Sequence, residues 1–384
     1  MTSTRTTTVT WTMANARRME RQGLVAPTGP APADVVDTLP AAHAQVMSAA
    51  ELSIGLRMTG ATRTDVRRAL WTDRSLVKTY GPRGTVHLLP SAGLPLWTGA
   101  LSAVPVGRGP FREGVRMTPE QTEAVLAAIA DALTGAELTV DELSDAVVER
   151  TGAWAGDPVM PAFQGMWPRW RQVLHLAGHR GALCFAAGRG RKVTFARPEV
   201  VPLDGARALV ALVRRYLHAY GPATPEHFAK WLAAPRGWAV DLFAGMAGRG
   251  EIEAVAYEGA PAWLVAGDTV FPEEPVRGVR LLPYFDAFLI ASRPRESLFP
   301  GATYHRALAG GQAGNFPVLL IDGTVAGVWH QRRSGRRISV TVEPLSPLTA
   351  GQLRGLEEQV ARVGEVLEGT PELTVGKVTV GAHA

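Results

Sequence analysis

The sequence predicts an α+β fold with three tandem winged-helix domains followed by a C-terminal β-barrel-like domain. Three helix-rich stretches follow one another, each ends in a pair of strands, and successive strands dominate from about residue 276. A chain of 384 residues also exceeds what one ordinary core holds. We therefore expect four domains, over residues 1–112, 113–202, 203–275 and 276–384.

The first domain is expected to consist of helices and a two-stranded wing. Apolar periodicity and capping residues predict helices over residues 12–22, 32–38, 49–58 and 62–71. Ser48-Ala49-Ala50-Glu51 has the pattern of a capping box that opens the third of these helices. Two alternating strands are predicted on either side of the turn Gly81-Pro82-Arg83-Gly84, over residues 76–80 and 85–89.

The same order of elements recurs twice further along the chain. The second domain is predicted to have helices over residues 118–133, 139–150 and 166–177 and strands over 181–187 and 192–196. The third is predicted to have helices over residues 204–219, 225–233 and 239–246 and strands over 252–257 and 262–265.

The last hundred residues have the alternation typical of strands. Strands are predicted over residues 278–283, 318–321, 325–329 and 337–342, followed by a helix over 348–367 and one final strand. Asp322-Gly323 is a strong signal for a two-residue hairpin turn. A small barrel or curled sheet accounts for this pattern.

Composition limits the class of protein. Lys and Arg number 40 against 35 Asp and Glu, a net charge of +5 that favours an anionic partner. The single cysteine, Cys184, lies in an apolar run, which excludes a disulfide framework and cysteine-held iron–sulfur or zinc sites and indicates a cytoplasmic protein. Residues 1–10 have no apolar core, and no eighteen apolar residues run together, so we expect neither a signal peptide nor a membrane span.

The tripeptide His43-Ala44-Gln45 is the candidate catalytic motif. It precedes a predicted helix, and side chains two residues apart point the same way in extended backbone. An imidazole beside a carboxamide can hold and orient one water molecule. The alternative is that His43 and Gln45 are simply polar residues at a helix entrance, which is the usual explanation of such a pair.

Three basic surfaces are candidate DNA contacts. The first surface, on the fourth helix and wing of the first domain, consists of Arg63, Arg67, Arg68, Lys78 and Arg83. The second, at the tip of the second hairpin, consists of Arg189, Arg191 and Lys192. The third, on the C-terminal hairpin, consists of Gln331, Arg332, Arg333 and Arg336. Ordinary solvated helix faces and charge-protected hairpins explain the same spacing.

The remaining histidines are given structural interpretations. His87 lies on a strand and is expected to be a core or edge residue, and His175 and His179 are four residues apart but have no evident third metal ligand. We expect no metal and no cofactor. Because no carboxylate cluster is apparent, a metal-dependent nuclease is not favoured.

Five segments, over residues 43–51, 83–90, 220–225, 281–286 and 322–329, resemble the AlkZ/YcaQ-like family of bacterial DNA glycosylases. Members carry Gln-Φ-Gln, Gln-Φ-Asp or His-Φ-Gln as the catalytic motif, and His43-Ala44-Gln45 resembles the last branch. The resemblance implies three winged-helix domains and a β-barrel. It also implies hydrolysis of the N-glycosidic bond of alkylated purines such as N7-alkylguanine, in repair or in self-resistance to DNA-alkylating natural products.

This chemistry agrees with the residues. N7 alkylation leaves the base positively charged and a good leaving group, so the enzyme has to stabilise an oxocarbenium-like sugar and place a water. We assign water orientation to Gln45 and hydrogen bonding or partial deprotonation of that water to His43, so activity should fall as His43 protonates. No lysine nucleophile is apparent near the motif, which predicts a monofunctional enzyme without lyase activity.

The expected partner is double-stranded DNA containing alkylated bases, bound by a nucleoid-associated monomer in an open cleft rather than by complete base flipping. The rival interpretation is a non-enzymatic winged-helix DNA-binding protein or transcriptional regulator, which would tolerate substitution of His43 and Gln45.

Overall fold

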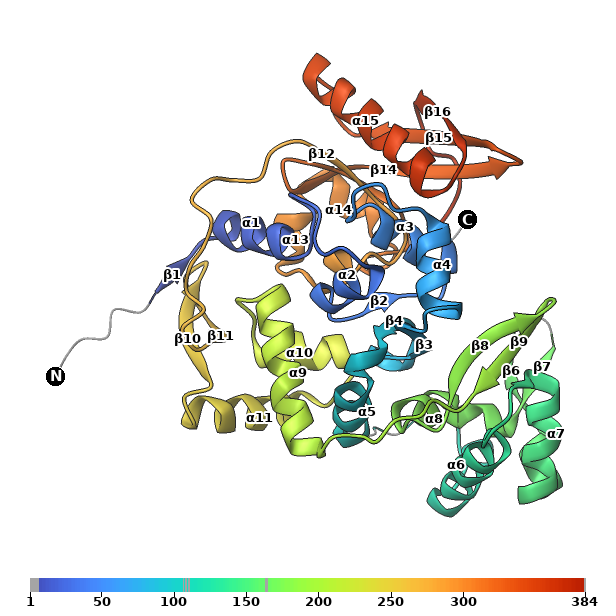
Figure 1. Cartoon of the computed structure of the whole chain (residues 1–384). Coiled ribbons are helices and arrows are strands. Elements are labelled where there is room, and N and C mark those ends of the chain that lie inside the picture. The colour runs from blue at the N-terminus through green and yellow to red at the C-terminus, as the bar shows by residue number, and fades with distance from the viewer. Residues whose placement is uncertain (1–6, 106, 108, 110, 163–164, 383–384) are drawn as a thin grey trace.

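Three groups of helices, each closed by a β-hairpin, precede a curled C-terminal sheet in the computed structural model (Figure 1). The structure describes residues 7–105, 107, 109, 111–162 and 165–382. It is a mixed α+β protein, as the sequence predicts. Among the described residues no helix is both long and apolar enough to span a membrane.

The first group places the candidate motif at a sheet edge. Its helices are α1 (Trp11–Arg21), α2 (Pro32–Thr38), α3 (Met47–Gly55) and α4 (Arg63–Trp71), and its strands are β2 (Ala42–His43), β3 (Leu76–Tyr80) and β4 (Val86–Pro90). The strands form one sheet in the order β2-β4-β3, and His43 pairs with His87 across β2 and β4. The motif is therefore fixed by strand pairing and not only by the helix that follows it.

The predicted capping box of α3 is wrong. The helix begins at Met47 and its N-cap residue is Val46, which makes no capping hydrogen bond, so Ser48 lies inside the first turn. Glu51 instead accepts hydrogen bonds from Arg67, with 2.6 Å between Arg67 Nε and Glu51 Oε1. Because Glu51 is buried, a guanidinium partner compensates its charge better than a backbone amide does.

The second group confirms two capping boxes and corrects one helix. Helix α6 (Pro119–Ala132) is capped by Thr118 and α7 (Val140–Thr151) by Thr139, as the sequence predicts. The helix expected over residues 166–177 is instead strand β7 (Met166–Pro168), a 3₁₀ turn and the short helix α8 (Leu174–His179). Pro168 explains the difference, because proline lacks the helical amide and restricts the residue before it. The strands of this group are β5 (Leu138–Thr139), β6 (Pro158–Pro161), β8 (Cys184–Arg189) and β9 (Lys192–Ala196).

The third group is tied to the N-terminal segment. It contains α9 (Gly205–Tyr220), α10 (Pro225–Leu232), α11 (Arg236–Gly248) and the hairpin of β10 (Ile252–Tyr257) and β11 (Ala260–Val265), and α9 packs against α5 (Leu94–Ala103). Strand β1 (Thr8–Val9) pairs in parallel with β10. Met19 of α1 packs in the same core as Leu282 and Phe288. Strand β1 and helix α1 thus join the third group and the C-terminal part, across the domain boundaries that the sequence predicts.

The C-terminal part is an open, curled five-stranded sheet. Its order is β12 (Val279–Leu282), β13 (Val318–Ile321), β14 (Thr324–Ser334), β15 (Arg337–Pro344) and β16 (Thr370–Val375), and only β16 is parallel to its neighbour. Asp322 and Gly323 both have positive φ, 50° and 81°, which confirms the predicted hairpin turn. Helix α15 (Ala350–Val366) packs on this sheet, and three short helices lie between β12 and β13: α12 (Ala287–Ala291), α13 (Arg295–Leu298) and α14 (Ala302–Ala307).

Candidate functional site

His43 lies at the junction of the first group and the C-terminal part. It is 9% exposed on β2, and its ring contacts two others: His87 of β4, with centroids 5.1 Å apart and nearly perpendicular planes, and Phe285, with centroids 4.5 Å apart. Phe285 comes from the loop between β12 and α12. Three elements far apart in the sequence therefore form the surroundings of the imidazole.

The imidazole of His43 is held neutral. Burial, and secondarily the positive charge of Arg83, lower the pKa of His43 to about 4. Its Nδ1 atom is buried and has no hydrogen-bond partner among the described residues. A neutral imidazole with an unpaired ring nitrogen can accept or donate a hydrogen bond to a bound water or substrate group.

His87 is buried, as the sequence predicts, and its tautomer follows from its neighbour. Its Nδ1 lies 2.9 Å from the carbonyl oxygen of Thr85, which only accepts, so Nδ1 carries the proton and donates it. Burial, reinforced by His43 and Arg83, lowers the pKa of His87 well below its ordinary value. Sequence reasoning missed its contact with His43, because no strand was predicted at residues 42–43 and the contact depends on the pairing of β2 with β4.

Gln45 lies outside the strand pairing. Ala44 makes the last ladder bond, with its amide 2.8 Å from the carbonyl oxygen of Val86, and the chain then bends. Gln45 is exposed whereas His43 is buried. The argument from extended backbone therefore does not apply to Gln45, whose side chain is exposed whereas the imidazole of His43 is buried.

A buried ion pair supports the residue that packs on His43. Phe285 has a left-handed backbone, φ 54°, and its amide donates to Gly314 at 2.9 Å. The next residue, Asp286, receives two bonds of 2.8 Å from Arg57 of the segment after α3 and one of 2.7 Å from Ser53. The side chains of Arg57 and Asp286 are both 0% exposed. Segment 281–286 belongs to the family-like sequence, but no role was predicted for these residues.

The residues of the predicted basic face of the first domain have different partners in the structure. Arg63 pairs with Glu368 at 2.9 Å, Arg67 pairs with Glu51, and Arg68 is 63% exposed near Asp65 and Asp73. The ammonium of Lys78 lies 5.1 Å from the ring centre of Phe185. Arg68 has the most exposed side chain of this set on α4, whereas Nε and Nη2 of Arg67 both donate to Glu51, so Arg68 is the member best placed to reach a ligand.

Arg83 lies away from this face. It has φ 62° in the 3₁₀ turn between β3 and β4, and its Nη1 donates to the carbonyl oxygen of Trp231 at 2.9 Å. Burial lowers the pKa of Arg83. Its charge acts on His43, so the structure places it by the imidazole rather than at the tip of an outward wing.

The hairpin of β14 and β15 presents exposed arginines. Arg332, Arg333 and Arg336 are exposed, whereas Gln331 is half-buried and its Oε1 has no partner among the described residues. Arg333 donates to the carbonyl oxygen of Leu367 at 2.5 Å and lies near Glu368, the partner of Arg63. Arg63 and Arg333 are thus brought together by the fold.

The hairpin of β8 and β9 belongs to a separate sheet and is already partly neutralised. Arg189 pairs with Glu142, and Lys192 pairs with Asp141 at 2.9 Å, whereas Arg191 is exposed. Any phosphate contact from Arg189 or Lys192 has to compete with these carboxylates.

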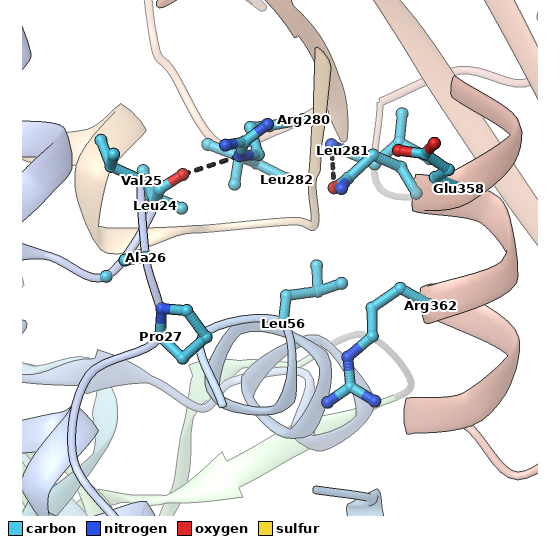
Figure 2. A pocket seen from close by; sticks show the side chains of 12 residues that line it. Leu24, Val25, Ala26, Pro27, Leu56, Arg280, Leu281, Leu282, Glu358 and Arg362 are labelled. Atoms are coloured by element: carbon cyan, nitrogen blue, oxygen red, sulfur yellow. Dashed lines mark hydrogen bonds between the residues drawn. The ribbon is translucent and has the colours of Figure 1, made fainter. Parts of the chain in front are cut away.

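A pocket of about 310 Å³ lies apart from the candidate motif (Figure 2). Its walls are the segment 23–27 after α1, Leu56, β12 and α15, and neither His43 nor Gln45 lines it. Figure 2 shows Arg280 donating to the carbonyl oxygen of Leu24, a bond of 2.7 Å. Arg362 also donates to carbonyl oxygens, those of Gly55, Met58 and Ala61. Both guanidinium groups therefore join the C-terminal part to the first group.

The pair His175 and His179 has a structural contact. The two rings are 5.8 Å apart, and Nε2 of His179 lies 3.0 Å from the carbonyl oxygen of Gly81. Within the described part of the chain, no three His, Cys, Asp or Glu side chains gather in a way that could hold a metal ion.

Exposed arginines on a hairpin suit phosphate contacts, and a neutral imidazole with an unpaired nitrogen suits the binding of a water, so the two together fit a DNA-binding enzyme. The family model described as "DNA glycosylase AlkZ-like" matches residues 36–366. The chain belongs to the AlkZ-like family of DNA glycosylases, so the predicted family and the predicted enzyme class are both confirmed.

Two comparisons with individual proteins agree. The "Interstrand DNA cross-link repair glycosylase" of Streptomyces sahachiroi is 31% identical over 337 residues, which are 83% of this chain and 87% of the relative. The solved structure of "Streptomyces sahachiroi DNA glycosylase AlkZ" superposes with a TM-score of 0.81 at 28% identity, covering 96% of this chain and 100% of that one.

Proposed function

We propose that this DNA glycosylase hydrolyses the N-glycosidic bond of N7-alkylguanine and related alkylated purines, without a metal and without lyase activity. The observation that carries the proposal is His43, a neutral buried imidazole with an unpaired ring nitrogen, two residues before the exposed Gln45 in the chain. Self-resistance to a DNA-alkylating natural product is the setting that the family resemblance favours. The name of the Streptomyces relative makes an interstrand cross-link a further substrate to test.

The proposed mechanism needs positioning more than proton transfer. An N7-alkylated guanine leaves as a neutral base, so no general acid is required, and the sugar becomes an oxocarbenium-like cation. Gln45 orients the attacking water, and His43 accepts a hydrogen bond from it. A base whose pKa is about 4 is weak, but the water becomes acidic as it bonds to the cationic sugar, and the proton then moves to the imidazole.

The repeated order of elements supports three winged-helix domains. In the first two groups a helix, a short strand, further helices and a hairpin follow one another, and the short strand lies at the sheet edge, in the orders β2-β4-β3 and β5-β9-β8. In the third group the bridge between Ala223 and Trp263 occupies the same place. We assign winged-helix domains to residues 1–112, 113–202 and 203–275, acting as a monomer on double-stranded DNA.

The DNA contacts follow from which cations are exposed. We assign backbone contacts first to Arg332, Arg333 and Arg336 on the C-terminal hairpin, which form no ion pair among the described residues, and next to Arg67 and Arg68 on α4, which are exposed but paired with carboxylates. Arg63, Lys78, Arg189, Arg191, Lys192 and Gln331 form the rest of the assigned interface. A non-enzymatic regulator is not favoured, because the family is one of glycosylases.

The test is base release from a duplex that carries one N7-methylguanine, read as alkali-labile strand cleavage with EDTA present. The wild-type protein should give abasic sites, and His43→Ala and Gln45→Ala should lose most of the activity. The exposed residues His305 and Gln312 supply matched controls, since His305→Ala and Gln312→Ala should remain fully active. Full activity of both motif variants would refute the assigned site, and strand cleavage without alkali would refute the monofunctional mechanism.

A further inference from the structure

Three half-buried arginines, one of which acts on His43, form no ion pair with a carboxylate among the described residues. Arg83 precedes β4, Arg293 follows α12 and Arg295 begins α13, and all three side chains are half-buried. Some arginines of this chain have a carboxylate partner, as Arg57 has Asp286 and Arg306 has Glu343, whereas Arg18 and Arg280 donate to carbonyl oxygens. Within the described residues none of the three forms such an ion pair.

Neutral carbonyl oxygens hold these guanidinium groups in place. Arg83 donates to Trp231, Arg293 to Ser292 at 3.1 Å and to Ile290 at 3.3 Å, and Arg295 to Ile290 at 2.7 Å and to Leu289. These bonds use one nitrogen of Arg83 and one of Arg293. A guanidinium has five N–H donors, so donors remain for a ligand with several oxygen acceptors.

The three positive charges oppose one another. Burial, then the charge of Arg293, lower the pKa of Arg295 to about 9, and burial is also the largest cause of the lowered pKa of Arg83 and of Arg293. The exposed carboxylate of Glu296 has a smaller effect in the opposite direction, because it raises the pKa of Arg293 and of Arg295. Tyr216 cannot supply a negative charge, because burial raises the pKa of its hydroxyl to about 12.

We propose that Arg83, Arg293 and Arg295 form a binding site for one backbone phosphate of the DNA strand beside the modified nucleotide. A phosphodiester carries the single negative charge and the oxygen acceptors that this group of cations lacks. The proposal rests on the proposed function, which places the reacting sugar at His43.

The charge of the reacting sugar makes such a counter-ion necessary. An N7-alkylated base and an oxocarbenium-like sugar are both cationic, and the charge of Arg83 is felt at His43. Unneutralised arginines at this place would repel the transition state. A bound phosphate removes that repulsion and fixes the sugar next to the motif.

The test uses binding, which does not depend on bond cleavage. Duplexes that carry a tetrahydrofuran abasic analogue are prepared with one neutral methylphosphonate at each phosphate around the analogue in turn, and affinity is measured by fluorescence anisotropy. With the wild-type protein, one position next to the analogue should weaken binding roughly tenfold. In the Arg293→Gln variant, a methylphosphonate at that position should not weaken binding further, whereas a methylphosphonate at each other position should have the same effect as in the wild-type protein.

Matched variants separate this site from others. Arg83→Gln should lose sensitivity to the methylphosphonate at the same position as Arg293→Gln does. Arg332→Gln should lose it at a different position. Arg214→Gln, on the exposed side of α9, should keep the wild-type sensitivity at every position. The wild-type series needs no variant, so misfolding of one variant does not prevent a decision. Indifference of the wild-type protein to every phosphate beside the analogue, or unchanged sensitivity in both Arg83→Gln and Arg293→Gln, would overturn the proposal. Protection from thermal unfolding by inorganic phosphate at constant ionic strength, without any methylphosphonate effect, would show a free-anion site and also overturn it. Because the analogue has no base to release, these outcomes are independent of whether His43 acts in hydrolysis.

Discussion

Asp286 and Arg57 form a fully buried ion pair in which each carboxylate oxygen receives one bond of 2.8 Å. Asp286 also accepts from the amide of Phe288, at 3.1 Å, and so begins α12. The pair thus fixes the chain on one side of Phe285, whose ring lies on His43. The position of the candidate motif therefore depends on a contact between the first group and the C-terminal part.

Removal of one partner of this pair should destabilise the protein severely. Asp286→Ala leaves the buried guanidinium of Arg57 without a counter-charge, which costs about 3–5 kcal/mol of unfolding free energy. Urea denaturation at pH 7.5 measures the loss. The double variant Arg57→Met, Asp286→Leu should lose much less unfolding free energy than the sum of the losses of the two single variants, Arg57→Met and Asp286→Leu. Additive losses would show that the two charges do not interact.

Activity should depend on pH through His43 at lower pH than an ordinary histidine would give. A water-binding imidazole works in its neutral form, and because burial lowers the pKa of His43 to about 4, that form persists through neutrality. Base release, corrected for spontaneous depurination, should be flat from about pH 8 to about pH 5.5 and fall below that. The charges nearest the ring are those of Arg83 and, if it protonates, His87.

The control for this profile is Arg83→Gln, which removes the nearby positive charge and should raise the pH at which activity falls. A fall centred near pH 6.5 in the wild-type enzyme would contradict the buried neutral state of His43.

Stability should decrease as the pH falls from neutral towards 5. Burial lowers the pKa of several histidines, to about 4 for His43, His179 and His227 and well below its ordinary value for His87. Unfolding restores an ordinary pKa near 6.5, so below that pH the unfolded state binds more protons and is favoured. Each histidine should contribute a loss of about 1.4 kcal/mol between pH 7.5 and pH 5.5.

Urea midpoints at these two pH values measure this loss. His179→Gln should reduce the difference between them, while the exposed His305→Gln should not change it. Equal midpoints for the wild-type protein at the two pH values would contradict the prediction.

The C-terminal hairpin should contribute more to DNA binding than the hairpin of the second group. Arg332→Gln with Arg336→Gln should weaken duplex binding and reduce the slope of log affinity against log salt by about 0.9 for each phosphate that is no longer neutralised. Arg189→Gln with Lys192→Gln should have a smaller effect, because Glu142 and Asp141 already neutralise these cations. Anisotropy titrations at several salt concentrations compare the two variants. A larger reduction of affinity in the second variant would reverse the assignment.

Local signals in the sequence predicted much of the fold. Capping by Thr118 and Thr139, the Asp322-Gly323 turn and the hairpins all depend on residues close together in the chain, and the structure has them. Predictions failed where a distant partner competed with a local one, as when Arg67 takes the carboxylate of Glu51 from the expected capping box. The three short helices between β12 and β13 had no periodicity long enough to detect.

The sequence by itself determined the family and the enzyme class, because short stretches of residues carry that information, and it predicted His43-Ala44-Gln45 as the candidate motif. The surroundings of the tripeptide depended on tertiary structure. Strand pairing sets His87 against His43, the buried pair of Arg57 and Asp286 holds Phe285 there, and Arg83 turns inward beside them. Burial and nearby charge then decide the protonation state of His43. Phe285, more than 200 residues further along the chain, contributes to the burial and Arg83 supplies the charge, so both depend on tertiary packing that no local pattern encodes.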